Sequence, residues 1–306
     1  MCTVESNCDN CKVRIIDLLI TLQDEADRSC SWLRDNQMVV AGDKTDLLVV
    51  GTLANRRSKL KDQKLEILVD GKVVSESSSK KLLGVIMNNT LTWKDRIETL
   101  ITQLSQRAGL LQNLSSSASR KKLQMFASGI FYSKLEYCLP LFVNTWGLDQ
   151  YNENEEKYVT MTKEQCRKLQ VLQNKVCRLM LPRSQQDQCR LKAQHISTSD
   201  LLKTANVLSI HQLGAYSTIL LAKKIMMDKK PIYLANQLMV SDNSNTRRGA
   251  LLTLPRVTLA ASRESFIYRA VKLRNRIPGS VWQEPSMMVF KKKLFEWTRA
   301  NIAVKP

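Results

Sequence analysis

The sequence predicts an α+β protein, in which a small antiparallel strand region is followed by a mainly helical remainder. Turn residues separate short β-branched runs within residues 1–90. Apolar residues recur at helical spacing through most of residues 91–306. The chain has 306 residues, of which 43% are hydrophobic. These values indicate a folded protein that is long enough to form two domains.

Residues 1–90 are expected to hold one helix and several short strands. Apolar residues from Ile15 to Leu33 recur at helical spacing and predict an amphipathic helix over 14–36. Strands are predicted over 38–41, 45–50, 65–69, 72–74 and 81–87. Asp70-Gly71 separates the third strand from the fourth, and an Asp-Gly pair is the usual turn of a two-residue β-hairpin.

Helices dominate the prediction for the rest of the chain. They are predicted over 95–114, 120–136, 163–181, 201–227, 262–277 and 285–301. Ser117 or Ser119 is suited to cap the second of these helices. The fourth is expected to be one helix or two, with a break near Asn206 or Gly214.

Positive charge is concentrated toward the C-terminus. The net charge is +19; residues 1–90 carry 13 basic and 13 acidic side chains, residues 91–182 carry 13 and 8, and residues 183–306 carry 21 and 7. Such asymmetry favours a polyanionic partner, and nucleic acid is the leading candidate. The alternative is a solvated basic surface that keeps the protein soluble.

Two groups of basic residues are candidate phosphate contacts. The first group, at the start of the predicted helix 120–136, is Arg120, Lys121 and Lys122. The second, which we call the C-terminal basic patch, is Arg247, Arg248, Arg256, Arg263, Arg269, Lys272, Arg274 and Arg276. Phosphate contacts position a protein on nucleic acid without reading its sequence. For the first group, the alternative is a solvated helix start.

The cysteine pattern does not indicate a disulfide-rich or zinc protein. Cys8 and Cys11 have the spacing of a metal-ligand pair, but no second pair follows them. We interpret the eight cysteines as reduced thiols of an intracellular protein, in the cytoplasm or the nucleus. His195 and His211 lack a nucleophile signature and are interpreted as structural. No apolar run reaches the roughly 18–20 residues that span a bilayer, so no membrane association is expected.

A series of short motifs occurs along the chain in a characteristic order. The motifs are Trp32-Leu33, Lys44-Thr45 with Gly51, Leu83-Gly84-Val85, Leu91-Thr92-Trp93, Leu135-Glu136-Tyr137-Cys138, Trp146-Gly147, Leu169 to Lys175 with Arg178, Leu254-Pro255-Arg256, Arg263 to Ala270, and Asn275 to Pro278. Over roughly residues 14–300 they resemble the palm end and thumb of reverse transcriptases from non-LTR retrotransposons of the LINE and jockey-like kind. Ala41, Arg96 and Arg274 depart from the residues usual in that family.

The resemblance implies a palm remnant over 1–90, thumb helices over 91–148 and a basic helical extension over 149–306. The parent activity is RNA-directed DNA polymerisation, a nucleotidyltransferase reaction that uses Mg²⁺ held by paired aspartates. The sequence contains no Asp-Asp pair. The resemblance places those aspartates before Met1, in a missing N-terminal polymerase portion. We therefore expect this chain to bind no cofactor, to have no catalytic residue and to be inactive alone.

The resemblance also suggests roles for particular residues. In an intact palm Lys44 would lie near the triphosphate, whereas in this chain an ordinary exposed turn lysine is the favoured interpretation. Leu83, Gly84 and Val85 would lie under the primer terminus, with a buried strand beside a helix as the alternative. The expected partners are an RNA template and an RNA–DNA duplex. The alternative functions are a non-catalytic nucleic-acid-binding protein and a non-functional relic of a truncated reading frame.

Overall fold

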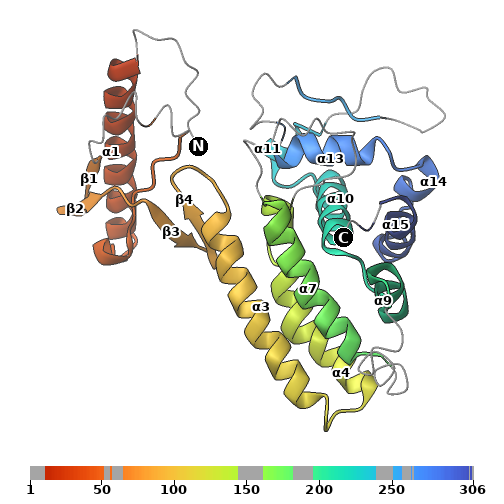
Figure 1. Ribbon diagram of the computed structural model, residues 1–306. Helices are drawn as coiled ribbons and strands as arrows, with labels where there is room; N and C mark the ends of the chain where they lie inside the picture. Colours follow the sequence, from red (N-terminus) through yellow and green to blue (C-terminus); the bar gives the residue numbers. More distant parts are fainter. Residues whose placement is uncertain are drawn as a thin grey trace. The chain divides into compact units, whose positions relative to one another are not determined.

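The computed structural model describes residues 11–51, 56, 65–143, 161–181, 196–238, 251–256, 263, 265–302 and 304. The chain divides into two compact units, Met1–Arg96 and Ile97–Pro306. The first is coloured red to orange in Figure 1, and the second runs from yellow to blue. Within the described residues the fold is mixed, with many helices and two antiparallel two-stranded sheets. None of the helices described here is both long and apolar enough to cross a membrane.

The first unit is built from a long helix and two hairpins. Helix α1 (Cys11–Asp35) packs against strand β1 (Glu66–Val69), which pairs with β2 (Lys72–Ser75). The turn residues Asp70 and Gly71 both have positive φ, at 52° and 76°, so the predicted Asp-Gly hairpin is confirmed. Side chains from α1, the following segment and both strands form a small core of Cys30, Leu47, Val69 and Val74.

Helix α1 also covers the outer edge of β1. The Gln23 amide donates to the carbonyl oxygen of Leu68 and accepts from its backbone N–H, both at 2.8 Å. The side chain therefore satisfies both backbone groups that an additional strand would use at this position. An edge protected in this way is a poorer template for pairing with another chain.

Three of the predicted strands were wrong. The structure has no strand over 38–41 or 45–50, where only Leu47 forms an isolated parallel bridge to Glu76. The predicted strand over 81–87 is instead a hairpin of β3 (Ser79–Leu82) and β4 (Val85–Asn88). A short apolar run shows that a segment can be extended, but pairing also requires a neighbouring strand in register.

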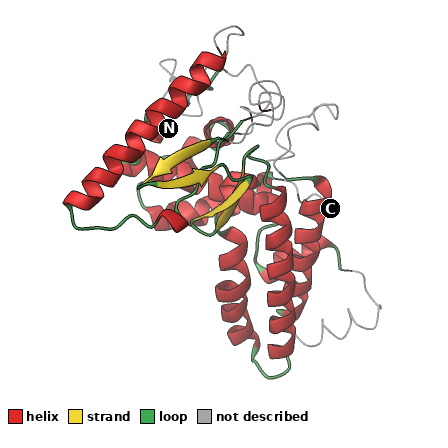
Figure 2. Ribbon diagram, turned by 90° about the vertical axis from the view of Figure 1, so that its left-hand side faces the viewer, coloured by secondary structure: helices red, strands yellow, loops and turns green. Residues whose placement is uncertain are grey.

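The described elements of the second unit are helices, drawn red in Figure 2. They are α3 (Lys94–Leu114, which begins at the end of the first unit), α4 (Arg120–Phe126), the π-helical segment η3 (Ala127–Tyr132), α5 (Ser133–Glu136), α6 (Leu139–Phe142), α7 (Lys163–Leu179), α9 (Thr198–Ala205), α10 (Ile210–Asp228), α11 (Ile232–Ala235), α13 (Phe266–Arg274), α14 (Gly279–Trp282) and α15 (Met287–Asn301). Each of the predicted helices has a counterpart here. Ser119 caps α4 by accepting the N–H of Lys122, as predicted.

Helix α10 is the centre of the second unit. It packs against α6, α7, α11, α13 and α15, and a helix buried on several sides is expected to be apolar all round. The break before α10 falls at Asn206, whose φ is 55°, while Gly214 lies inside the helix. Helix α6 packs on α10, and residues 97–306 form one compact unit, whereas residues 91–96 belong to the first unit.

Gly214 allows this close packing. A Cβ atom built on Gly214 would lie 2.1 Å from Cγ1 and 2.9 Å from Cβ of Val143. Val143 is 1% exposed, so its side chain has no open space into which to move. The residue that follows α6 therefore fits onto α10 only because position 214 lacks a side chain.

Buried amide side chains fix the ends of neighbouring helices. Gln170 of α7 accepts the N–H of Ile210 at 3.1 Å and so caps the start of α10. Gln173 donates to the carbonyl oxygen of Leu208 at 2.8 Å. Gln212 of α10 donates to the carbonyl oxygen of Ile302 at 2.7 Å, just after α15. Backbone groups at and beside helix ends lack intrahelical partners. The buried glutamine side chains supply those partners, so their burial is compensated by hydrogen bonds.

We predict that Gly214→Ala lowers the free energy of unfolding by about 1–3 kcal/mol, since the added methyl group clashes with a buried side chain. Gly109→Ala is the matched control, because a Cβ there has nothing within 4 Å and lies inside α3. That control is expected to stabilise the protein by about 0.5–1 kcal/mol. Thermal and urea unfolding measure the stability of both variants. Equal effects of the two substitutions would contradict the packing described for Val143.

Candidate functional site

Lys44 lies at an exposed turn of the first unit. It is the last residue of the 3₁₀ turn η2 (Gly42–Lys44), and its backbone N–H donates to the carbonyl oxygen of Ala41 at 2.9 Å. The neighbouring Asp43 pairs with Lys72 of β2 at 3.1 Å, and both side chains are well exposed. Such an exposed pair contributes little to stability. The geometry gives Lys44 no role beyond that of an exposed turn lysine.

Leu83 and Gly84 form the tip of the β3–β4 hairpin. Both have positive φ, at 46° and 81°, which is the backbone of a two-residue type I′ turn. Glycine adopts this conformation freely, whereas leucine does so at a cost of about 1–2 kcal/mol. Leu83 is also 83% exposed, while Val85 is buried at the base of the turn. Leu83 is therefore an exposed leucine on a strained backbone. It does not lie in a buried strand, which is the alternative given for this segment in the sequence analysis.

The three cations of the first basic group stand in the first turn of α4. All three are exposed. Arg120 is already engaged, because its Nε donates to the carbonyl oxygen of Met180 at 2.8 Å. That carbonyl lies at the C-terminal cap of α7 and lacks a helical partner. Arg120 thus joins the start of α4 to the end of α7, and Lys121 and Lys122 stand beside this junction.

The structure divides the C-terminal basic patch into unlike parts. Arg247 and Arg248 lie outside the described residues. Of the other members, Arg256 and Arg263 are exposed, Lys272 and Arg276 are half-buried, and Arg269 and Arg274 are buried. The six described members therefore do not form one accessible cationic surface.

Arg269 has a structural role that the sequence did not indicate. Its side chain is 4% exposed and extends from α13 to the end of α6. One terminal nitrogen donates to the carbonyl oxygen of Val143, and the other donates to that of Pro140 at 2.6 Å. The last carbonyls of a helix carry partial negative charge and lack intrahelical donors. This removes Arg269 from the set of phosphate contacts, because its guanidinium is enclosed.

Arg274 is buried in a second cationic cluster. Its guanidinium lies 4.5 Å from the centroid of the Trp282 ring, and burial lowers its pKa to about 10. Lys223 lies 5.1 Å from the same ring and donates to the carbonyl oxygen of Trp282 at 2.8 Å. Burial, and then the nearby charge of Arg274, lower the pKa of Lys223. Two cations therefore pack against one indole, so Arg274 is also removed from the set of phosphate contacts.

A row of cations on the outer side of α7 was missed by the sequence analysis. Its members, which we call the α7 basic face, are Arg167, Lys168, Lys175 and Arg178, and all are exposed. The signal was present, because residues spaced by three, four and seven positions share one side of a helix.

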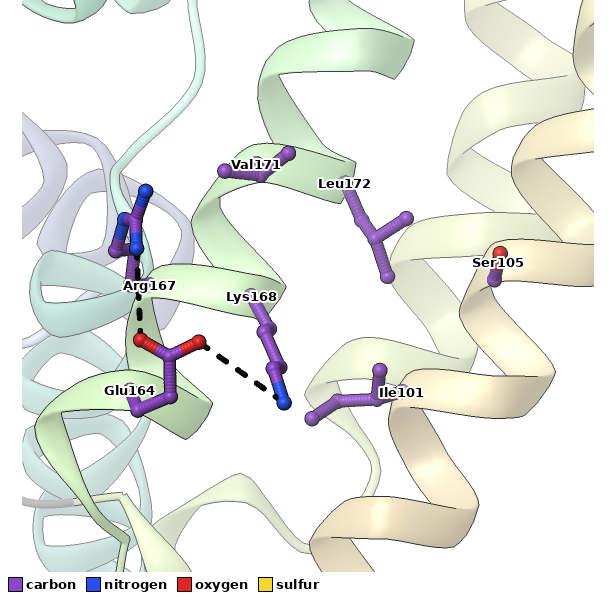
Figure 3. Close-up of a pocket in the computed structure, with 7 residues that line it drawn as sticks. All are labelled: Ile101, Ser105, Glu164, Arg167, Lys168, Val171 and Leu172. Atoms are coloured by element: carbon purple, nitrogen blue, oxygen red, sulfur yellow. Dashed lines mark ion pairs between the residues drawn. The ribbon is translucent and has the colours of Figure 1, made fainter.

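A shallow cavity of about 310 Å³ lies between α3 and α7. Figure 3 shows Lys168 extending into this space toward Ile101 of α3, with Leu172 and Ser105 also facing it. Glu164 pairs with Arg167 at 3.5 Å and with Lys168 at 3.9 Å. The lining is mostly apolar, with its charge at the α7 edge.

Metal-binding side chains do not gather in the part of the chain that the structure describes. No group of three or more His, Cys, Asp or Glu residues is placed to hold an ion there. Cys8 and the side chain of Cys11 lie outside the described residues. Cys166 and His211 approach to 3.1 Å between Sγ and Nε2. Burial raises the pKa of the Cys166 thiol to about 12, which favours its protonated form.

Comparisons with protein-family models, with curated proteins and with solved structures found no match to this chain.

We predict that Arg269→Met lowers the free energy of unfolding by about 2–5 kcal/mol, because the buried carbonyl group of Val143 and the half-buried one of Pro140 lose their donor. Arg256→Met is the matched control on an exposed arginine of the same patch and should change stability by less than about 0.5 kcal/mol. Thermal unfolding measures the stabilities of the two variants. Similar stabilities for both variants would show that Arg269 does not hold the end of α6.

Proposed function

We propose that this chain is the C-terminal palm-and-thumb portion of an RNA-directed DNA polymerase of non-LTR retrotransposon origin. In this proposal it contacts the template–primer duplex but does not polymerise by itself. The first unit corresponds to the palm remnant, and the second to the thumb with its basic helical extension. The ordered motifs of the sequence suggest this lineage, and the features below support nucleic-acid contact.

The tip of the β3–β4 hairpin is the observation that carries the proposal. Leu83-Gly84-Val85 is the segment that the resemblance associates with the primer terminus. A buried strand there would have favoured a purely structural role. An 83% exposed leucine with positive φ instead favours contact with a partner, because strained backbone positions tend to persist where function requires them. Lys81 of β3 stands near the tip and is exposed, whereas Lys80 pairs with Asp46 at 2.6 Å.

The distribution of charge supports a polyanionic partner after the buried cations are set aside. Lys223, Arg269 and Arg274 are enclosed and do not add to the accessible surface charge. Exposed cations remain at α4, on the α7 basic face and at Arg256 and Arg263. Electrostatic contact with phosphates needs cations that the ligand can reach.

The residues present do not provide the metal centre of a polymerase. Two Mg²⁺ ions held by paired carboxylates would activate the primer hydroxyl and stabilise the leaving group. The sequence has no adjacent aspartates. Asp24-Glu25 lies on α1, where Asp24 is exposed and Glu25 pairs with Arg28 at 2.9 Å. We therefore derive no catalytic step for this chain.

The second candidate is a nucleic-acid-binding protein that no longer serves a polymerase. The same exposed cations favour this second candidate. Unlike the palm-and-thumb portion of a polymerase, such a protein would not need to recognise a primer terminus. Preference for a duplex with a recessed 3′ end over a blunt duplex would support the palm-and-thumb proposal. Equal binding of the two duplexes would support the second candidate. A chain that binds neither would be consistent with a relic.

We predict that the pure chain incorporates no nucleotide on an RNA template with a DNA primer in the presence of Mg²⁺. It should nevertheless bind that duplex, with an affinity that falls at least about tenfold between 50 and 200 mM salt. Primer extension and fluorescence anisotropy measure the two properties. Incorporation by the pure chain would overturn the first statement, and absent or salt-independent binding would overturn the second.

We predict that Leu83→Asn separates stability from binding. Asparagine tolerates positive φ, so the hairpin should gain up to about 1 kcal/mol of stability. Binding to the recessed duplex should weaken, because the apolar tip is lost. Leu82→Asn is the control, since Leu82 is also exposed but lies in β3, before the turn. Unchanged affinity of Leu83→Asn would contradict contact at the tip.

A further inference from the structure

One side of α7 combines exposure with a strong excess of positive charge. At 100° of rotation per residue, positions 164, 167, 168, 171, 175 and 178 fall within an arc of about 100°. All of these residues are exposed, whereas Leu169, Gln173, Val176 and Cys177 on the other side are buried. The exposed arc carries the four cations of the α7 basic face, one acid and one apolar residue.

The single acid on this side is Glu164. It pairs with Arg167 and Lys168 at the N-terminal end of the helix. Lys175 and Arg178, at the other end, have no carboxylate partner among the residues that the structure describes. A solvated surface face usually mixes both signs of charge. A four-to-one excess along one helix is typical of a surface that meets a polyanion.

The row continues beyond α7. Arg120 donates to the carbonyl oxygen of Met180, just past the end of the helix, and so places the start of α4 beside it. Lys121 and Lys122 are exposed in that first turn. The exposed cations of α4 therefore begin next to the end of α7, within the second unit.

The dimensions of the row suit a nucleic-acid backbone. Arg167 and Arg178 are eleven residues apart, which corresponds to about 16 Å along a helix. Successive phosphates of one strand advance by about 3.4 Å along the duplex axis, so a row of this length can contact more than one of them. Val171, in the middle of the row, is 56% exposed and faces the cavity beside α3. A sugar edge can contact such an apolar surface while its phosphates meet the cations.

From these observations we infer that the α7 basic face, with Lys121 and Lys122 of α4, is the surface that binds the phosphate backbone of the duplex. This inference rests on the proposed function and names the site for it. Contact is through phosphates and does not depend on base sequence. Glu164 opposes binding, because it competes with phosphate for Arg167 and Lys168.

The test uses the full chain and a fluorescein-labelled 20-base-pair RNA–DNA duplex, followed by anisotropy at several salt concentrations. The double variant Lys175→Gln/Arg178→Gln should weaken binding about tenfold or more at 100 mM salt and lower the salt slope by about 2. Glu164→Gln should tighten binding several-fold. The matched control is Lys291→Gln/Lys292→Gln on the exposed side of α15, with the same change in net charge and an expected effect below about threefold.

The outcomes separate this inference from the function on which it rests. If the unaltered chain binds and the α7 and α15 double variants weaken binding equally, the attraction is diffuse and the α7 site is wrong. Weaker binding by Glu164→Gln would also overturn it. If the unaltered chain does not bind the duplex, the proposed function fails and the site fails with it. Thermal unfolding of each variant confirms that the fold is intact.

Discussion

Val143 is the point on which the packing of the second unit depends. Its carbonyl oxygen accepts from Arg269 of α13, and its side chain rests on α10 at Gly214. Val143 therefore joins the end of α6 to the N-terminal part of α10 and to α13. Pro140 receives the other arm of the same guanidinium. Both hydrogen bonds satisfy carbonyl groups that a short helix leaves without donors, and the one to Val143 is buried, so loss of the guanidinium leaves a buried carbonyl without a donor.

The burial of Arg269 and Arg274 changes which basic residues can account for binding of a polyanion. A value of +19 with most of the excess after residue 182 suggested that the C-terminal helices form the nucleic-acid surface. Arg269 and Arg274 of that segment instead cap a helix end and lie against an indole ring, respectively. Charge that is needed inside the fold cannot attract a ligand by contact. Exposed cations also lie on α7 and α4, where the sequence is less densely basic.

The sequence predicted the features that are local and missed those that depend on partners. Helical spacing predicted the long helices, Ser119 predicted a cap, and Asp70-Gly71 predicted a hairpin, because each is decided within a few residues. Leu83 gave no such signal, since leucine rarely occupies a turn with positive φ. Arg274 could have been recognised as buried, because it follows Ala270 by four positions on the apolar side of its helix. Arg269 could not, because its partners lie more than a hundred residues away.

The central claim is that the basic residues of the second unit divide into enclosed structural cations and an exposed binding row. Arginine-selective labelling of the native chain, read residue by residue by mass spectrometry, tests it most directly. We expect Arg269 and Arg274 to stay unmodified until the protein is denatured, while Arg167, Arg178 and Arg256 react in the folded state. Modification of Arg269 at the rate of Arg178 in the folded protein would contradict it.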